Sequence, residues 1–126
     1  MVKSRKIKTS ELDRVFSKYV RLLADGRCRR CGHTVKKLDC AHFHGRGDYS
    51  IRWDLDNVTA LCMGCHGFLD SNPLEKIEFF MEKLGTERYN ALNARRNNHD
   101  KVDRELLLAK YKAGIKDLEN ADCEAI

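Results

Sequence analysis

Two Cys-x-x-Cys pairs constrain this chain more than any other feature of its sequence. The first pair is Cys28 and Cys31, and the second is Cys62 and Cys65. Four thiolates form the ligand set of a closed tetrahedral zinc site, in which each Zn–S bond measures about 2.3 Å. The two pairs of a zinc ribbon usually lie about 15 to 20 residues apart, whereas here residues 32–61 separate them. The spacing therefore predicts a structural zinc site with an additional structure inserted between its two halves.

The length of the chain makes such a metal important for stability. A chain of 126 residues has the size of one domain with a modest core. Zinc bound to four cysteines can contribute on the order of 10 kcal/mol to folding, which is comparable to the whole stability of a small domain. We therefore expect metal binding to be a condition for folding.

The six cysteines could alternatively form three disulfides, which would require an oxidising compartment. However, the first eight residues have no apolar run behind their charges, so we expect no signal peptide. No stretch approaches the roughly 20 apolar residues of a membrane span. A cytoplasmic protein with reduced thiols is the better interpretation. Cys40 is then expected to be a small buried residue on a strand, and Cys123 a free thiol in the C-terminal tail.

The net charge of +5 is unevenly distributed along the chain. Residues 1–37 hold 12 Lys and Arg against 3 Asp and Glu, a balance of +9, and residues 38–126 hold 12 against 16, a balance of −4. A basic half of this kind is typical of a protein that binds a polyanion, and nucleic acid is the leading candidate. The alternative is a cationic surface that is merely solvated.

The N-terminal segment divides into an arm and a helix. Residues 1–8 are charged and without a period, and we interpret them as a disordered basic arm. A helix is predicted from Ser10, which would cap it together with Asp13, because apolar residues then recur with helical spacing. The helix should end near Asp25 and Gly26, where glycine tolerates a left-handed conformation.

A strand hairpin is predicted between the two cysteine pairs. Extended structure is expected over 35–44 and over 51–53, with a glycine-rich loop between them. Asp56 and Asn57 would then begin a helix that leads into the second pair. The insertion is therefore expected to contribute two strands and a helix to the core.

Helices dominate the remainder of the chain. They are predicted over 73–85, 86–96 and 102–120 from their start signals and apolar faces, with a break at 97–99. The domain organisation is then a core over 9–72, which includes the N-terminal helix, and a helical extension over 73–126. The fold class is α+β, with a small zinc-bound core flanked by N-terminal and C-terminal helices.

Histidines are concentrated around the inserted structure. Alternate residues of a strand share a face, so Cys40, His42 and His44 should point one way, and Asp39 and Ala41 the other.

His66 directly follows the last cysteine and should lie at the start of a helix near the hairpin, with Asn57 from the intervening segment. Such a set can hold a divalent cation and leave positions open for water and phosphate. A metal-assisted phosphodiester hydrolase needs this arrangement.

The order Cys-x-x-Cys, Ala-His-Phe, Asp-x-Asp-Asn, Cys-x-x-Cys-His resembles the HNH endonucleases, the zinc-supported branch of the ββα-metal nucleases. The segments 42–46, 52–57 and 62–65 are similar to those of phage recombination nucleases of the lambda NinG type. The resemblance covers about residues 27–70 and implies a zinc-bound ββα-metal (HNH) core. It also implies a DNA endonuclease that acts in phage or prophage DNA processing or recombination, in the cytoplasm of the bacterial host.

The resemblance also implies a role for each matching residue. His42 would be the general base, Asn57 would orient His42 or help to place the metal, and His66 would bind the catalytic cation, which is Mg²⁺, Mn²⁺ or zinc. The four cysteines of the two pairs would hold a structural zinc ion.

The sequence departs from the family pattern at Ala41. Many family members have Asp or His at this position, directly before the general base, as the metal ligand on the strand. Asp39 and His44 are the alternatives here: His44 shares the face of His42, whereas Asp39 would require a bulge or twist. A degenerate site without activity is also compatible with Ala41.

Four arginines are the candidate DNA contacts. Arg46 and Arg52 lie next to the histidine motif, and Arg29 and Arg30 lie within the first cysteine pair. Surface solvation is the alternative for these side chains. Phosphate contacts position a protein without specifying a sequence, so the structure of the DNA substrate stays open.

Two other functions explain part of the pattern. A non-catalytic zinc module that binds nucleic acid would use the same cysteines and the same basic half. A zinc-dependent protein-interaction domain of the treble-clef type explains the cysteines but not the basic half or the three motif residues together. The last helix is amphipathic enough to pack on this domain or to pair with a second copy, so a homodimer is possible.

Overall fold

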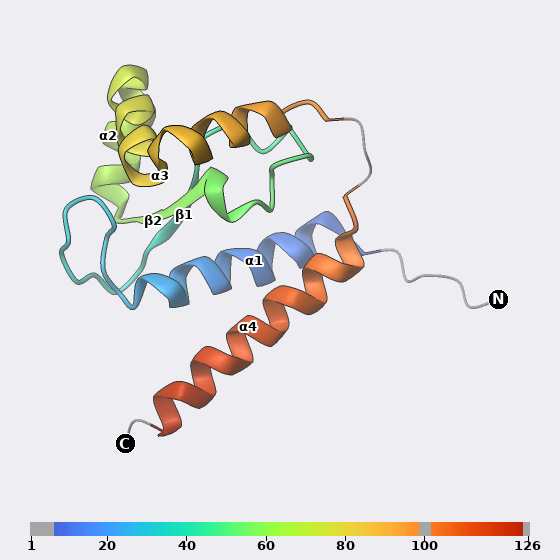
Figure 1. The fold of residues 1–126 in the computed structure, drawn as a ribbon. Coiled ribbons are helices and arrows are strands. Elements are labelled where there is room, and N and C mark those ends of the chain that lie inside the picture. Colours follow the sequence, from blue (N-terminus) through green and yellow to red (C-terminus); the bar gives the residue numbers. More distant parts are fainter. Residues whose placement is uncertain (1–6, 99–101, 125–126) are drawn as a thin grey trace.

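The computed structural model describes residues 7–98 and 102–124, which form four helices and one two-stranded sheet (Figure 1). The helices are α1 (Thr9–Ala24), α2 (Met63–Ser71), α3 (Pro73–Arg95) and α4 (Arg104–Glu124). The strands are β1 (Asp39–His42) and β2 (Val58–Leu61), and the short 3-10 helix η1 (Leu55–Asn57) leads directly into β2. The predicted α+β class is confirmed.

The sheet is antiparallel, and its register pairs Asp39 with Leu61 and His42 with Val58. The first strand is shorter than predicted, since only 39–42 of the segment 35–44 is paired. The strand predicted over 51–53 is wrong, because these residues form a turn. The second strand is β2, which lies where the sequence predicted the start of a helix.

The physical reason for these errors is burial. All four residues of β2 are buried, so the strand has no alternation of apolar and polar residues by which to recognise it. Ile51 and Trp53 are equally buried, at 0% and 2% exposure, but they reach the core from a turn. Two apolar residues on either side of the polar Arg52 therefore looked like the alternation of a strand.

Helix α1 begins at Thr9, and Lys8 precedes it without a side-chain capping hydrogen bond. The predicted cap by Ser10 and Asp13 is wrong, because Asp13 binds groups far along the chain instead. The helix ends as predicted, with Asp25 and Gly26 in the left-handed region at φ 52° and 78°. Of the predicted arm, residues 1–6 lie outside the described part, whereas Ile7 is buried in the core at 5% exposure.

Helix α3 changes direction at Gly85, where φ is 79° and ψ is 163°. The sequence predicted this break between two helices, and Pro73 occupies the first turn as expected. The sequence Asn72-Pro73-x-Glu75 also predicted that the side chain of Asn72 caps this helix. That cap is wrong, because the Nδ2 of Asn72 donates to the carbonyl of Phe68 in α2. Of the predicted break at 97–99, position 99 lies outside the described residues.

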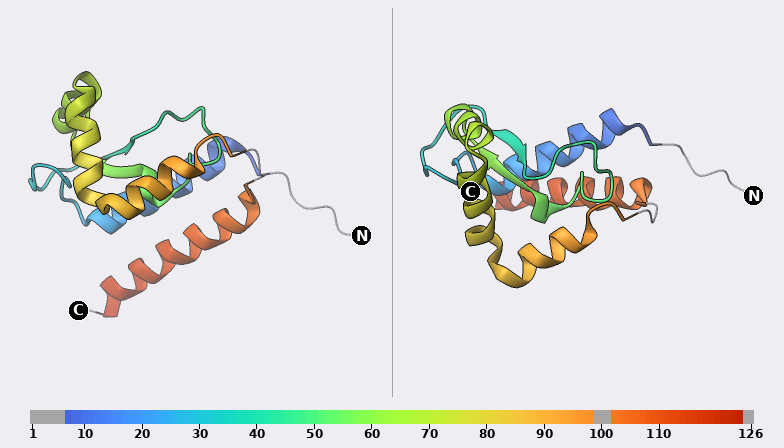
Figure 2. Two further views of the ribbon diagram at one scale, coloured as in Figure 1. Left: turned by 45° about the horizontal axis from the view of Figure 1, so that its top comes forward. Right: turned by 90° about the horizontal axis from the view of Figure 1, so that it is seen from above.

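Helix α4 packs along α1 and completes the main core (Figures 1 and 2). Tyr111 lies against Phe16 and Tyr19, with ring centroids 4.9 and 5.5 Å apart. Its hydroxyl donates to the carbonyl of Trp53 at 2.5 Å. A Cβ atom added at Gly114 would lie 2.5 Å from the ring of Tyr19, so glycine permits this close approach.

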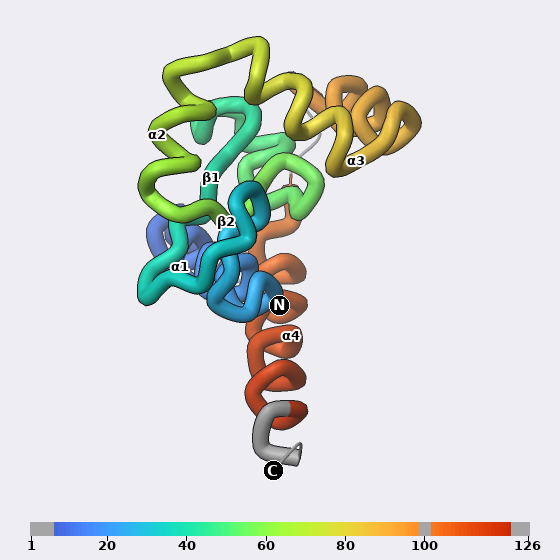
Figure 3. The backbone as a smooth tube through the Cα atoms, turned by 90° about the vertical axis from the view of Figure 1, so that its left-hand side faces the viewer, coloured from blue at the N-terminus to red at the C-terminus, as the bar shows by residue number. Residues whose placement is uncertain are grey.

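Helices α2 and α3 lie on the opposite side of the molecule from α4 (Figure 3). α3 also forms a small second core, in which Leu84 and Leu92 surround Ile51. Among the described residues, no helix combines the length and the apolar character that a bilayer span requires. The predicted tail thiol, Cys123, lies beyond the side chains that the structure describes.

Candidate metal centre and active-site cleft

The two cysteine pairs converge on one point between α1 and α2. One sulfur atom from each of the four cysteines lies within 4.8 Å of the other three. Gly32, at φ 77°, closes the turn after the first pair, and its N–H donates to the carbonyl of Cys28. Cys62 is the N-cap of α2, and its Sγ accepts from the N–H of Cys65 at 3.4 Å.

The thiols of this cluster are not equivalent. Burial raises the pKa of Cys28, but hydrogen bonds from nearby backbone amides outweigh it and lower this pKa to about 6. Burial raises the pKa of Cys65 to about 12 although Arg30 donates to its Sγ, because the neighbouring sulfurs also oppose its ionisation. Four thiolates at this spacing repel one another, and a bound cation would offset that repulsion.

The cluster fits a structural metal ion. Four sulfur ligands complete the coordination of zinc and leave no open position for a substrate. The four cysteines could therefore hold a metal such as zinc, as the sequence predicted, and catalysis has to be sought elsewhere.

A second group of predicted site residues lines an open cleft of about 490 Å³ between α1, β1 and the start of α2. Asp39, His42 and His66 all line this cleft. Asp39 and His42 are an odd number of residues apart in β1, so strict strand alternation would have placed their side chains on opposite faces. Three arginines border the same cleft: Arg14, Arg21 and Arg46.

His42 is oriented by the backbone of the loop that follows β1. Its Nε2 lies 2.9 Å from the carbonyl oxygen of Arg52. A carbonyl oxygen only accepts hydrogen bonds, so Nε2 carries the proton of the neutral ring and Nδ1 keeps its lone pair. Burial lowers the pKa of His42 below 6.5, although the bond to Arg52 opposes this effect. The ring is therefore neutral at pH 7.

His66 is held between two carboxylates. Its Nδ1 lies 3.0 Å from Oδ2 of Asp39, and its Nε2 lies 3.2 Å from Oδ2 of Asp70. Its side chain and that of Asp39 are 30% and 31% exposed, so both are accessible from the cleft. Asp39 and His44 were the two candidates for the strand metal ligand that Ala41 cannot supply. Of these two, Asp39 is the one that lies beside His66.

His44 points elsewhere. Its Nε2 lies 2.8 Å from Oδ1 of Asn93 in α3, and its ring packs on Phe43 at 4.2 Å between centroids. The strand ends at His42, so the alternation that would place His44 on the same face does not continue. The structure does not bring His44 to the cleft.

Asn57 is fully buried and does not line the cleft. Its Oδ1 accepts from the N–H of His44 at 2.9 Å, and its Nδ2 donates to the carbonyls of His44 and Ile51, both at 3.2 Å. One side chain thus fixes both ends of the loop that contains Arg46. Asn57 is therefore a positioning residue for the segment that follows the general-base candidate.

Asp13 is the residue of this region that the sequence interpretation missed. Its carboxylate accepts two hydrogen bonds from Arg52, at 2.5 and 3.0 Å, and one from Trp53 Nε1 at 2.9 Å. Arg46 adds a contact at 3.0 Å. The side chain of Arg52 is only 12% exposed and is paired with Asp13, whereas the side chain of Arg46 is 59% exposed. Of these two predicted DNA contacts, Arg46 is the accessible one.

Replacing Asp13 with asparagine should lower the free energy of unfolding by about 3 kcal/mol, because Arg52 would lose its partner in a site that is largely removed from water. Burial by itself raises the pKa of Asp13, but the hydrogen bonds from Arg52 and Trp53 outweigh it, so this pKa lies below 3.8. The stabilisation is therefore complete above pH 3.8 and is lost as the pH falls through the lower, folded pKa.

Urea denaturation of the Asp13→Asn variant at several pH values measures both effects. Asp25→Asn is the matched control, since Asp25 is exposed at the end of α1. Equal stability of the Asp13→Asn variant and the control at neutral pH would contradict this role of Asp13.

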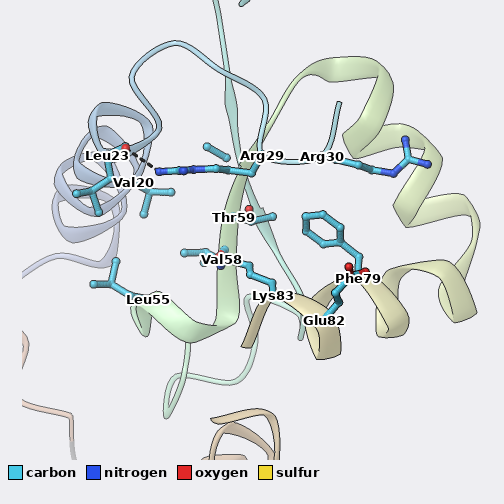
Figure 4. A pocket seen from close by; sticks show the side chains of 11 residues that line it. Val20, Leu23, Arg29, Arg30, Leu55, Val58, Thr59, Phe79, Glu82 and Lys83 are labelled. Atoms are coloured by element: carbon cyan, nitrogen blue, oxygen red, sulfur yellow. Dashed lines mark hydrogen bonds between the residues drawn. The ribbon is translucent and has the colours of Figure 1, made fainter. Parts of the chain in front are cut away.

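The other two predicted DNA contacts lie on a different side of the sheet. The guanidinium of Arg29 donates to the carbonyl of Leu23 at 2.7 Å. That of Arg30 lies over the ring of Phe68, 4.4 Å from its centroid. Both residues line a cavity beside β2 (Figure 4). The four predicted arginines therefore do not form one continuous contact surface.

The fold and the site define a small α+β protein with a four-cysteine cluster that could hold a metal and with a separate histidine-lined cleft. A family model of the bacteriophage lambda NinG protein matches residues 1–122. The chain therefore belongs to the NinG family of phage proteins, as the motifs indicated. Comparison with curated proteins and with solved structures finds no significant match.

Proposed function

We propose that this NinG-family protein is a metal-dependent HNH endonuclease that hydrolyses DNA phosphodiester bonds. The observation that carries the proposal is the shared cleft of Asp39, His42 and His66, bordered by three arginines. The order of β1, β2 and α2 along the chain is that of a ββα-metal core. Membership of the NinG family supports a role in phage recombination or DNA processing.

His42 is the proposed general base. Because Nε2 is held by the Arg52 carbonyl, Nδ1 is the atom that would accept a proton from the attacking water. The lowered pKa of His42 keeps this nitrogen unprotonated at neutral pH. Water would attack the phosphorus atom, and the bond between phosphorus and the leaving sugar oxygen would break.

Asp39 and His66 are the proposed ligands of the catalytic cation. A carboxylate oxygen and an imidazole nitrogen suit Mg²⁺ or Mn²⁺, and Mg²⁺ is usually held by one or two carboxylates with several waters. A cation bound there would supply charge neutralisation at the scissile phosphate and at the leaving oxygen. Among the described residues, only the cysteines form a group of three or more metal-binding side chains, so water and phosphate would complete the coordination.

The surrounding charges suit a DNA backbone. Arg14, Arg21 and Arg46 border the cleft, so an anionic strand could lie across it. Asn57 fixes the loop that carries Arg46, through three hydrogen bonds to the backbone of that loop. Loss of Asn57 would therefore disturb His42 and Arg46 together.

Cleavage of supercoiled plasmid by the purified protein tests the proposal. Nicking should require added Mg²⁺ or Mn²⁺, and a His66→Ala variant should be slower by about 100-fold or more, because a cation contributes several kcal/mol to the transition state. His33→Ala is the matched control, since His33 is an exposed histidine outside the cleft. Nicking that is equally fast in the His66→Ala variant would disprove the proposed site.

One observation favours a second function, a zinc-stabilised module that binds nucleic acid without cutting it. Both ring nitrogens of His66 are already engaged by carboxylates, and Ala41 offers no ligand on the strand. A cation would have to displace Asp70 or Asp39 from His66. DNA binding without nicking under any added metal would support this function.

A further inference from the structure

A cavity of about 670 Å³ lies beside β2 and shares no lining residue with the His42 cleft. It is open to solvent and is bordered by α1, the segment between the first two cysteines, β2 and α3 (Figure 4). Its volume lies in the ordinary range for small-molecule sites. Nothing in the proposed hydrolysis uses this cavity.

The edge of β2 in this cavity cannot accept a further strand. The carbonyl of Val58 accepts from Lys83 Nζ at 2.6 Å, and the carbonyl of Ala60 accepts from the N–H of Arg29 at 3.0 Å. An added strand would need these two acceptors for its own ladder of hydrogen bonds. The occupant of the cavity is therefore not an extended peptide that continues the sheet.

Thr59 supplies an unused polar group in the cavity wall. It is 2% exposed, and its Oγ1 is the buried side-chain N or O atom without a hydrogen-bond partner among the described residues. A buried hydroxyl without a partner is uncommon in native proteins. A ligand that bonds to this hydroxyl would regain the missing interaction.

Charge and shape around Thr59 favour a flat, anionic ligand. The ring of Phe79 points toward Thr59 and the strand (Figure 4), and Val20 and Leu23 make the wall on the side of α1 apolar. Arg29 and Lys83 bring positive charge to the same cavity, against the single carboxylate of Glu82. The guanidinium of Arg30 points away from it (Figure 4).

We propose that this cavity binds one unpaired nucleotide of the DNA, with the base against Phe79 and an edge of the base at Thr59 Oγ1. The phosphate would lie near Arg29 and Lys83, since Lys83 Nζ keeps further protons to donate beyond its bond to Val58. Stacking of bases on aromatic side chains beside a cationic wall is a common mode of binding single strands. The inference rests on the proposed DNA binding but not on cleavage.

Fluorescence anisotropy with a labelled oligothymidylate of about 12 nucleotides, without added divalent cation, tests this site. Thr59→Val keeps the shape of the side chain and removes only the hydroxyl, so it should fold and raise Kd by about 5-fold. Phe79→Leu should raise Kd by on the order of 10-fold through loss of stacking. The matched control is Thr86→Val, because Thr86 is exposed on α3.

The outcomes separate this inference from the nuclease proposal. His42→Ala should bind the oligonucleotide as the wild type does, and amide chemical shifts of Thr59 and Phe79 should move on binding, even if the wild type cuts no plasmid. Unchanged Kd in folded Thr59→Val and Phe79→Leu variants would overturn the inference. It would also be overturned if an acidic, leucine-rich peptide, but not the oligonucleotide, shifted these resonances, since the occupant would then be a protein.

Discussion

A Cys28→Ser variant should fail to fold at neutral pH and should contain no zinc. Zinc held by four cysteines contributes on the order of 10 kcal/mol, which is comparable to the 5 to 15 kcal/mol that stabilise a typical domain. Cys28 is 2% exposed and belongs to the same core cluster as Leu38 and Leu61, so loss of the metal would also disturb the packing of α1 against the sheet. Circular dichroism and native mass spectrometry measure the two effects.

Cys40→Ala is the matched control for this prediction. Cys40 is a thiol on β1 that lies outside the four-sulfur cluster, so its loss should leave one zinc per chain and a folded protein. A Cys28→Ser variant that folds as cooperatively as Cys40→Ala, with no metal bound, would show that the cluster does not stabilise the fold.

The cysteine cluster could be predicted from the sequence because each half is local. A Cys-x-x-Cys pair brings two sulfurs together within one turn, and the only long-range requirement is that two such turns meet. The strands were harder to predict, because β2 is buried on every side and shows no period. Its pairing with β1 depends on the register, which brings Asp39 opposite Leu61 across the sheet.

The cleft could be predicted in its residue types but not in its contacts. Strand alternation favoured His44 as the partner of His42, yet β1 ends at His42, and the chain that follows turns toward Asn93. Asp13 looked like a helix cap from its position three residues after Ser10. Its partners, Arg52 and Trp53, lie about 40 residues away in the sequence, and no local sequence pattern predicts such a contact.

His42→Ala should reduce plasmid nicking by about 100- to 10,000-fold, the usual contribution of a general base. The rate of the wild type should rise with pH up to the pKa of His42, which burial places below 6.5, and should stay level from there to neutral pH. The base acts in its unprotonated form, so the rate falls when acid protonates His42. Raising the pH above the pKa of His42 should not increase the rate further. The residual rate of the variant should lack this rise, because the titrating group is absent.

The fold and the DNA affinity of the His42→Ala variant separate catalysis from structure. The variant loses the hydrogen bond to the Arg52 carbonyl and the ring contact with Phe16, 6.5 Å between centroids. Such a hydrogen bond contributes about 1 kcal/mol, so the variant should remain folded with zinc bound. Gel-shift affinity for plasmid should be unchanged, because the arginines that border the cleft remain. Nicking by His42→Ala at the wild-type rate, with the same pH profile, would place the chemistry at another residue.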